Sequence, residues 1–158
     1  MTNSGDRPRT VLAGIDGGPS SRDVLRSAAT LADREDATVI VAHVVRPFVP
    51  ILPEAAFVHD ASVPDEVTAT LFPCVVESLY DTSVAFRMIT LVGDVPLKLA
   101  EVSRRLAPRA VVVGRGSNTT PARLRRWLSG TMSERLARLQ PAPVMVVDVA
   151  RPIASLLP

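Results

Sequence analysis

The sequence predicts an α/β fold, in which a five-stranded parallel sheet carries helices on both faces. The length of 158 residues matches one domain with a single core. Hydrophobic residues make up 47% of the chain and charged residues 22%, which is typical of a globular protein. Short, nearly continuous apolar runs alternate with segments of helical periodicity. That alternation is typical of a parallel sheet buried between two helical layers, a three-layer α/β/α sandwich.

We place this domain at residues 10–150. Residues 1–9 are polar, and we expect them to form a disordered leader. Residues 151–158 form a short apolar tail after the last predicted strand. Prolines punctuate residues 47–64, which predicts a long loop, and loops of this length are often functional. The chain contains no internal repeat, which agrees with a single domain at residues 10–150.

The first predicted unit is strand, helix, strand. The apolar run Thr10–Ile15 predicts a buried strand, and the Asp-Gly-Gly-Pro sequence at 16–19 predicts the turn that ends it. Ser20 and Asp23 form a loose capping box, which predicts the start of a helix. Thr38–Val45 is again continuously apolar and predicts the second strand.

The next elements follow the proline-rich loop. Asp65–Tyr80 has helical character, but Pro73 lies in its middle and is expected to kink or split the helix. Ala85–Val92 predicts the third strand. Pro96 suits the first turn of a helix that continues to Leu106.

The last part of the chain repeats the alternation. Ala110–Val113 predicts the fourth strand, and a loop rich in glycine, serine and threonine follows it. Residues 124–128 then predict a short basic helix, and Met132–Leu139 a longer one. Val144–Val149 predicts the fifth strand.

Composition and charge argue against several classes of function. Aromatic residues are only 4% of the chain, too few for the stacking platforms of single-strand nucleic-acid binders. The net charge of +2 is too small to predict a nucleic-acid partner. Cys74 is the only cysteine, which fits a reducing compartment. Because the chain lacks a signal-peptide pattern and a membrane-spanning apolar run, we expect a soluble cytoplasmic protein.

The expected ligand site lies at the carboxyl ends of the strands. In open parallel sheets, ligands bind outside these ends, at the point where the strand order reverses. Asp16, Val44 and the loop after Gly114 come to this edge. Asp16 also has a simpler interpretation, as a turn former or helix cap, and the sequence leaves both open.

Three C-terminal segments carry a resemblance to a known family, and three N-terminal features agree with them. The C-terminal segments are Val111–Gly114, Leu124–Leu136 and Pro141–Val147. The N-terminal features are Asp16 after the first strand, His43-Val44 at the end of the second, and Gly93-Asp94 before the third helix. Together they resemble the universal stress proteins, the UspA-like family, over nearly the whole chain.

The resemblance implies a fold, a ligand and a role. The family fold is Rossmann-like, of the adenine-nucleotide alpha-hydrolase type, and we expect its strand order, 3-2-1-4-5. The implied role is regulation under stress rather than efficient catalysis, at most with slow ATP hydrolysis. Many members bind ATP, with Mg²⁺, while others do not. The nucleotide contacts that the resemblance implies here are Gly14, Ile15, Asp16, Val44, Gly114, Gly116, Gly130, Thr131 and Met132.

The glycine pattern of this chain departs from that of ATP-binding members. Those members carry Gly-x-x-Gly, nine residues, and then Gly-Ser or Gly-Thr. Gly130-Thr131 matches the end of the motif and Gly114 its start. Gly130 follows Gly114 by sixteen positions, however, which is three more than the family spacing. Gly116 follows one residue too early, and Thr120 occupies the second glycine position when counted back from Gly130. Because backbone N–H groups approach phosphate most closely at glycine, we expect weak ATP binding.

Arginines beside this loop could replace the phosphate contacts that the missing glycines would have provided. Arg115, Arg125 and Arg126 could contact phosphate through their guanidinium groups. Alternatively, Leu124, Trp127 and Leu128 bury one face of a short helix and the arginines form its solvated side. The sequence therefore leaves two functions open, a nucleotide-binding regulatory module and a nucleotide-free dimeric interaction protein.

The remaining candidates suggest structure rather than chemistry. His43 lies in an apolar strand and is interpreted as a hydrogen-bonded structural residue. His59 lies in the proline-rich loop beside Asp60. These two residues do not make a metal site, no cysteine pair is available to complete one, and no catalytic residues are predicted. The last strand, Val144–Val149, is expected at a sheet edge, where it would build a homodimer as the family commonly does. The sequence does not identify any other protein partner.

Overall fold

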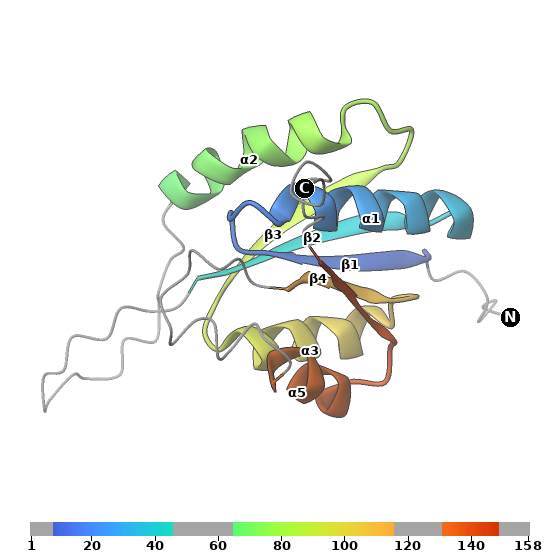
Figure 1. Ribbon diagram of the computed structural model, residues 1–158, viewed down its shortest axis with the longest axis vertical. Helices are drawn as coiled ribbons and strands as arrows, with labels where there is room; N and C mark the ends of the chain where they lie inside the picture. Colours follow the sequence, from blue (N-terminus) through green and yellow to red (C-terminus); the bar gives the residue numbers. More distant parts are fainter. Residues whose placement is uncertain (1–7, 46–64, 116–130, 149–158) are drawn as a thin grey trace, which may run out of the picture.

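The computed structural model describes residues 8–45, 65–115 and 131–148. Figure 1 shows a central sheet with helices above and below it. The elements, in chain order, are β1 (Thr10–Ile15), α1 (Ser21–Glu35), β2 (Thr38–Val45), α2 (Asp65–Leu79), β3 (Phe86–Val92), α3 (Val95–Leu106), β4 (Val111–Gly114), α5 (Thr131–Leu139) and β5 (Val144–Val147).

The sheet has the predicted topology. Its five strands run parallel in the order β3-β2-β1-β4-β5. The register pairs Ile15 with His43 on one side of β1 and Gly14 with Val113 on the other. The chain builds the sheet outward from β1 to β3 and then returns to place β4 against the other side of β1. The strand order therefore reverses between β1 and β4.

The two faces of the sheet carry separate apolar cores. Helices α1 and α2 cover one face, and α3 and α5 cover the other (Figure 1). Successive residues of a strand point to opposite faces, so Val11 and Ala13 join the core under α1 while Leu12 joins the core under α3. Because β1 and β2 are covered on both sides, their apolar runs are continuous, as the sequence analysis inferred.

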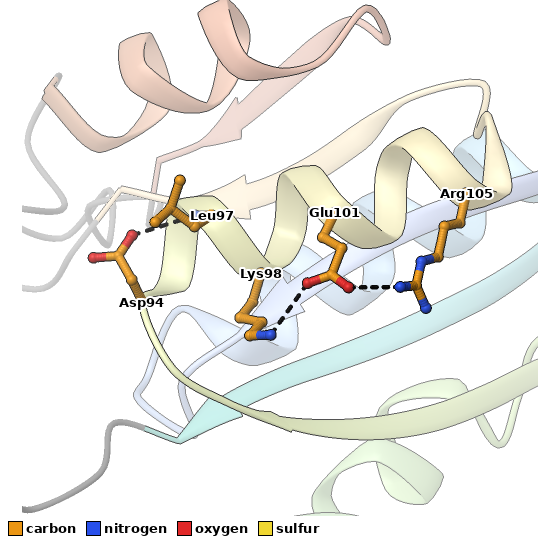
Figure 2. A network of polar contacts seen from close by, with 5 residues as sticks. All are labelled: Asp94, Leu97, Lys98, Glu101 and Arg105. Atoms are coloured by element: carbon orange, nitrogen blue, oxygen red, sulfur yellow. Dashed lines mark hydrogen bonds and ion pairs between the residues drawn. The ribbon is translucent and has the colours of Figure 1, made fainter. Parts of the chain in front are cut away.

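The third helix begins as predicted at a proline in its first turn. Asp94, in extended conformation, is the N-cap, and its carboxylate accepts a hydrogen bond of 3.3 Å from the Leu97 N–H (Figure 2). Pro96 costs nothing here, because the first N–H groups of a helix have no partner within the helix. The helix ends at Ala107, which adopts the left-handed conformation with φ 47°.

Two local predictions differ from the structure. The helix α2 continues through Pro73 without a break, so of the kink or split expected there, the split does not occur. Proline removes one backbone hydrogen bond, and packing of Val75 and Leu79 against α1 holds the turns that follow. The capping box at Ser20 is also absent: Ser20 is the N-cap of α1 but makes no side-chain cap hydrogen bond.

Element ends agree closely with the prediction. The strands β3 and β4 each begin one residue later than expected, and β4 includes Gly114. The proline-rich loop at 47–64, the predicted basic helix at 124–128 and the tail at 151–158 lie outside the described residues. Within the described ranges, no helix has both the length and the hydropathy needed to cross a membrane.

Candidate functional site

The candidate site lies where the strand order reverses. Asp16 directly follows β1, and Gly114 ends β4, the neighbouring strand. Such a reversal leaves an opening beyond the carboxyl ends of the strands, because the connections from the two strands leave toward opposite faces. The structure therefore brings together two residues that are almost a hundred positions apart in the sequence.

The turn after β1 is held by the Asp16 carboxylate. Its Oδ1 accepts hydrogen bonds from the Gly18 N–H at 2.8 Å and from the Ser21 hydroxyl at 3.3 Å. The Ser21 Oγ in turn accepts a hydrogen bond from the Gly17 N–H at 3.1 Å. Asp16 is thus a turn former, one of its two predicted roles, and this small network replaces the capping box expected at Ser20. Its carboxylate is exposed at the edge of the sheet.

Gly17 is required by this turn. Its φ is +80°, a conformation that residues with a Cβ rarely adopt. A Cβ at this position would also lie 2.7 Å from Cδ2 of Leu71 on α2. The turn is therefore packed against α2 as well as bonded to α1.

Gly114 is a point of close packing between β4 and α1. A Cβ built there would lie 2.8 Å from Ser20 Oγ and 3.2 Å from Val24 Cγ2. Ser20 itself is buried. The space that the missing side chain leaves is thus filled by the first turn of α1, a structural reason for glycine that the sequence analysis did not identify.

Two further predicted contacts, Gly14 and Ile15, end β1. The Ile15 side chain is buried in the core under α1 and α2. A Cβ on Gly14 would lie 3.1 Å from Leu99 Cδ1 and 3.2 Å from Val113 Cγ1, on the opposite face. At these two positions the backbone lies at the edge of the sheet. The Ile15 side chain packs in one core, and residues of the other core occupy the space beside Gly14.

The end of β2 supplies His43 and Val44. His43 Nδ1 lies 3.0 Å from the Ile15 carbonyl oxygen, so Nδ1 carries the proton and donates. This bond ties β2 to the end of β1 and agrees with the structural role expected for His43. Val44 is buried in the core under α3. Both strand ends are therefore firmly positioned at the edge.

Arg115, a predicted phosphate contact, has an acidic partner in this structure. Its guanidinium lies 3.2 Å from Asp148 Oδ2, and its backbone N–H donates to the Val147 carbonyl at 2.8 Å. Both side chains are exposed, at 59% and 69%. Asp148 is not among the predicted contacts, and the only signal for it in the sequence is its place near the end of the strand predicted at Val144–Val149, next to the fourth strand.

The remaining predicted residues lie at or beyond the limits of the description. Gly116, Gly130, Arg125 and Arg126 lie outside the described residues. Thr131 is the first described residue of α5. The side chains of Thr131 and Met132 are not described.

A charged network lines α3, beyond Asp94 (Figure 2). Glu101 accepts from Lys98 at 3.1 Å and from Arg105 at 2.8 Å. The hydrogen bond from Lys98, and then the positive charges of Lys98 and Arg105, hold the pKa of Glu101 below its ordinary value. The only lysine of the chain is therefore engaged along its own helix. Over the described ranges, no group of three or more metal-ligating side chains occurs.

Comparison with known proteins gives a consistent result. A model of the universal stress protein family matches residues 8–148. No curated protein sequence matches significantly. A universal stress protein solved in complex with cAMP is 21% identical, with a TM-score of 0.65 over 92% of this chain and 100% of that one.

Two further solved structures share the fold. A universal stress protein from Archaeoglobus fulgidus in complex with dAMP is 18% identical, with a TM-score of 0.59 over 88% of this chain and 96% of that one. A protein of the same family from Burkholderia pseudomallei is 20% identical, with a TM-score of 0.62 over 90% and 98% of the two chains. At such identities the structures establish the likeness of fold alone.

Proposed function

The chain belongs to the universal stress protein family, and we propose that it acts in the stress response as a regulatory module that binds an adenine nucleotide weakly. The observation that carries the proposal is the placement of Asp16 and Gly114 on either side of the strand-order reversal. Related folds solved with cAMP and dAMP support an adenine nucleotide as the ligand class. The role proposed is binding and signalling, without efficient turnover.

The described residues fit the nucleoside half of such a ligand. Among them, the turn after β1 uses only Oδ1 of Asp16, so Oδ2 can accept a hydrogen bond from a ribose hydroxyl. The exposed position of Asp16 agrees with this use. Val44 would pack near the base, as the family resemblance implies. The phosphates, with Mg²⁺, would lie toward Gly130-Thr131, where the family resemblance places a helix N-terminus whose N–H groups favour an anion.

Two features argue that the phosphate half is weak. The glycines from Gly114 to Gly130 lack the family spacing. Arg115 is already paired with Asp148, so a phosphate must compete with a carboxylate for its guanidinium. Each lost hydrogen bond to a charged group costs about 1.5–3 kcal/mol. Two such losses move a micromolar dissociation constant to about the millimolar range.

An Asp148→Asn variant tests this account of the phosphate half. Removing the carboxylate frees Arg115 for phosphate without changing the size of the side chain. Calorimetric titration with ATP and Mg²⁺ should then give a dissociation constant several times lower than that of the wild type. Adenosine, which has no phosphate, should bind both proteins equally. Equal ATP affinity in the two proteins would show that Arg115 does not contact the phosphates.

A nucleotide-free dimeric interaction protein is the second candidate. It is favoured by the packing at Gly114, where Ser20 fills the space that a glycine of a phosphate loop would otherwise leave for a ligand. In either case we propose a homodimer built on β5, an edge strand whose Met145 and Val146 are 41% and 39% exposed. The two candidates differ in whether ATP at millimolar concentration binds at all.

A further inference from the structure

The helix α2 is apolar on two sides. Its inner side contributes Val75 and Leu79 to the core under α1. A second row of apolar residues lies along the outside and spans about 100° of the helix circumference, since each residue advances by about 100°. We call the α2 outer stripe four residues of this row, Ala69, Phe72, Pro73 and Val76, together with Tyr80, which directly follows the end of the helix at Leu79.

The α2 outer stripe is accessible. Phe72 is 48% exposed and Tyr80 is 85% exposed. The other flank of the helix turns toward α1, because Glu77 forms an ion pair of 2.7 Å with Arg22 there. The stripe therefore faces away from that contact, and Figure 1 shows α2 as the outermost helix of its layer.

The composition of the stripe marks it as unusual within this chain. Isolated exposed apolar residues are normal on protein surfaces, whereas contiguous ones mark interaction sites. Aromatic residues are only 4% of the chain, and its single tyrosine is nevertheless the exposed Tyr80. Tyrosine is enriched among the residues that contribute most to binding energy at interfaces.

The charges around the stripe identify the chemistry of its partner. The helix contains neither lysine nor arginine. Exposed carboxylates lie at both ends, on Glu66 and Asp81, and the helix C-terminus adds a partial negative charge with no basic residue in its last turn to offset it. The two ends of the apolar surface thus form an acidic border, while on the flank toward α1 the carboxylate of Glu77 is paired with Arg22.

The acidic charges at this border indicate which kinds of partner can cover the apolar stripe. Two copies of α2 packed antiparallel across a two-fold axis would place their acidic ends together, and like charges repel. An anionic lipid surface would be repelled in the same way. A helix with an apolar face can cover the stripe, and lysine or arginine on its flanks can pair with the carboxylates at the ends of the stripe. From Ala69 to Val76 the helical part of the stripe is about 10 Å long, which is two turns of helix, and Tyr80 extends it beyond the end of the helix.

We propose that the α2 outer stripe is a docking surface for a cationic amphipathic helix of another protein. This surface is separate from the carboxyl edge of the sheet and from β5. It gives the domain a place to contact a regulated partner, whatever happens at the nucleotide site. The expected arrangement is a helix laid along α2, with its apolar residues between Phe72 and Tyr80 and its cations near Glu66 and Asp81.

A designed peptide tests the proposal directly. The probe is a fluorescein-labelled helical peptide of about 18 residues, with leucine on one face and lysine on the other. Fluorescence anisotropy should show binding to the wild-type protein, weakened about tenfold or more in Phe72→Ser/Tyr80→Ser. Tyr80→Ser alone, at a site too exposed to affect folding, should weaken it in the same direction. Leu97→Ser, which changes an exposed leucine on the opposite layer, should bind like the wild type.

Two further experiments, charge reversal and a measurement of self-association, test which partner covers the stripe. Exchanging lysine for glutamate in the peptide should abolish binding, and Glu66→Lys/Asp81→Lys should weaken binding of the lysine peptide severalfold. Equal binding of the two peptides, or unchanged binding to the Phe72→Ser/Tyr80→Ser variant, would overturn the proposal. So would a fall in the mass measured by light scattering for that variant, because the occupant would then be a second copy of this chain.

Discussion

Gly114 and Ser20 are in direct packing contact, so that a Cβ on Gly114 would lie 2.8 Å from Ser20 Oγ. The end of β4 and the first turn of α1 can approach this closely only because position 114 has no side chain. The contact joins the two elements that flank the proposed site.

Gly114→Ala is therefore expected to destabilise the fold. Overpacking of a close contact costs about 1–3 kcal/mol. Urea denaturation should show this as a lower free energy of unfolding. The matched control is Ser20→Gly/Gly114→Ala, in which the clashing hydroxymethyl group is removed, and it should recover most of the loss. If Gly114→Ala is as stable as the wild type, the close contact is not a constraint.

Asp16 is expected to affect stability through the turn that it holds. Asp16→Ala removes the acceptor for the Gly18 N–H and the Ser21 hydroxyl, at a cost of about 1 kcal/mol. Asp16→Asn retains an oxygen at Oδ1 and should unfold within a few tenths of a kcal/mol of the wild type. Thermal denaturation of the wild type and the two variants measures this difference. If Asp16 only contacted a ligand and did not hold the turn, both variants would be as stable as the wild type.

The lowered pKa of Glu101 predicts that the stability of the protein depends on pH. Because its pKa is lowered in the folded protein, its contribution to stability is full above the ordinary carboxyl pKa and is lost as the pH falls through the lowered value. Glu101→Gln should therefore be less stable than the wild type at neutral pH, and the difference should disappear in acid. Lys98→Met, which removes the largest cause of the shift, should reduce the same difference. A gap between wild type and Glu101→Gln that is constant with pH would contradict this assignment.

The edge strand β5 predicts a dimer. Two copies of β5 related by a two-fold axis would cover Val146 and Met145. Light scattering at about tens of micromolar, a concentration that suits a micromolar interface, should return the mass of a dimer. Val146→Lys should return that of a monomer, while Leu97→Lys, on an exposed part of α3, should not. A monomeric wild-type protein would exclude this assembly.

Most of the fold was predictable because it follows from local patterns. Continuous apolar runs located all five strands, and the family resemblance correctly implied their order. Pro96 and Gly93-Asp94 correctly located the start of α3. Pro73 does not split α2 as the sequence allowed, because the cost of one missing hydrogen bond in a helix is offset by tertiary packing that a helical pattern does not reveal.

The site was less predictable because it depends on contacts between distant residues. Nothing near Gly114 in the sequence indicates that Ser20 packs against it. The pairing of Arg115 with Asp148 follows from the strand register of β4 and β5. The buried Gln140, which accepts a hydrogen bond from Ser103 on α3 at 2.6 Å, likewise has no signal in the residues around it. A choice between two roles for Asp16 needed the turn geometry itself.

Titration of the isotope-labelled protein with ATP and Mg²⁺, followed by nuclear magnetic resonance, tests weak nucleotide binding most directly. The backbone amide signals of Gly17, Gly18 and Arg115 surround the strand-order reversal and should shift together as ATP is added. Their common dissociation constant should be about millimolar, the value expected for a phosphate half with two contacts missing. If these signals do not move at several times that concentration, or if only signals remote from this edge shift, the proposed nucleotide site is wrong.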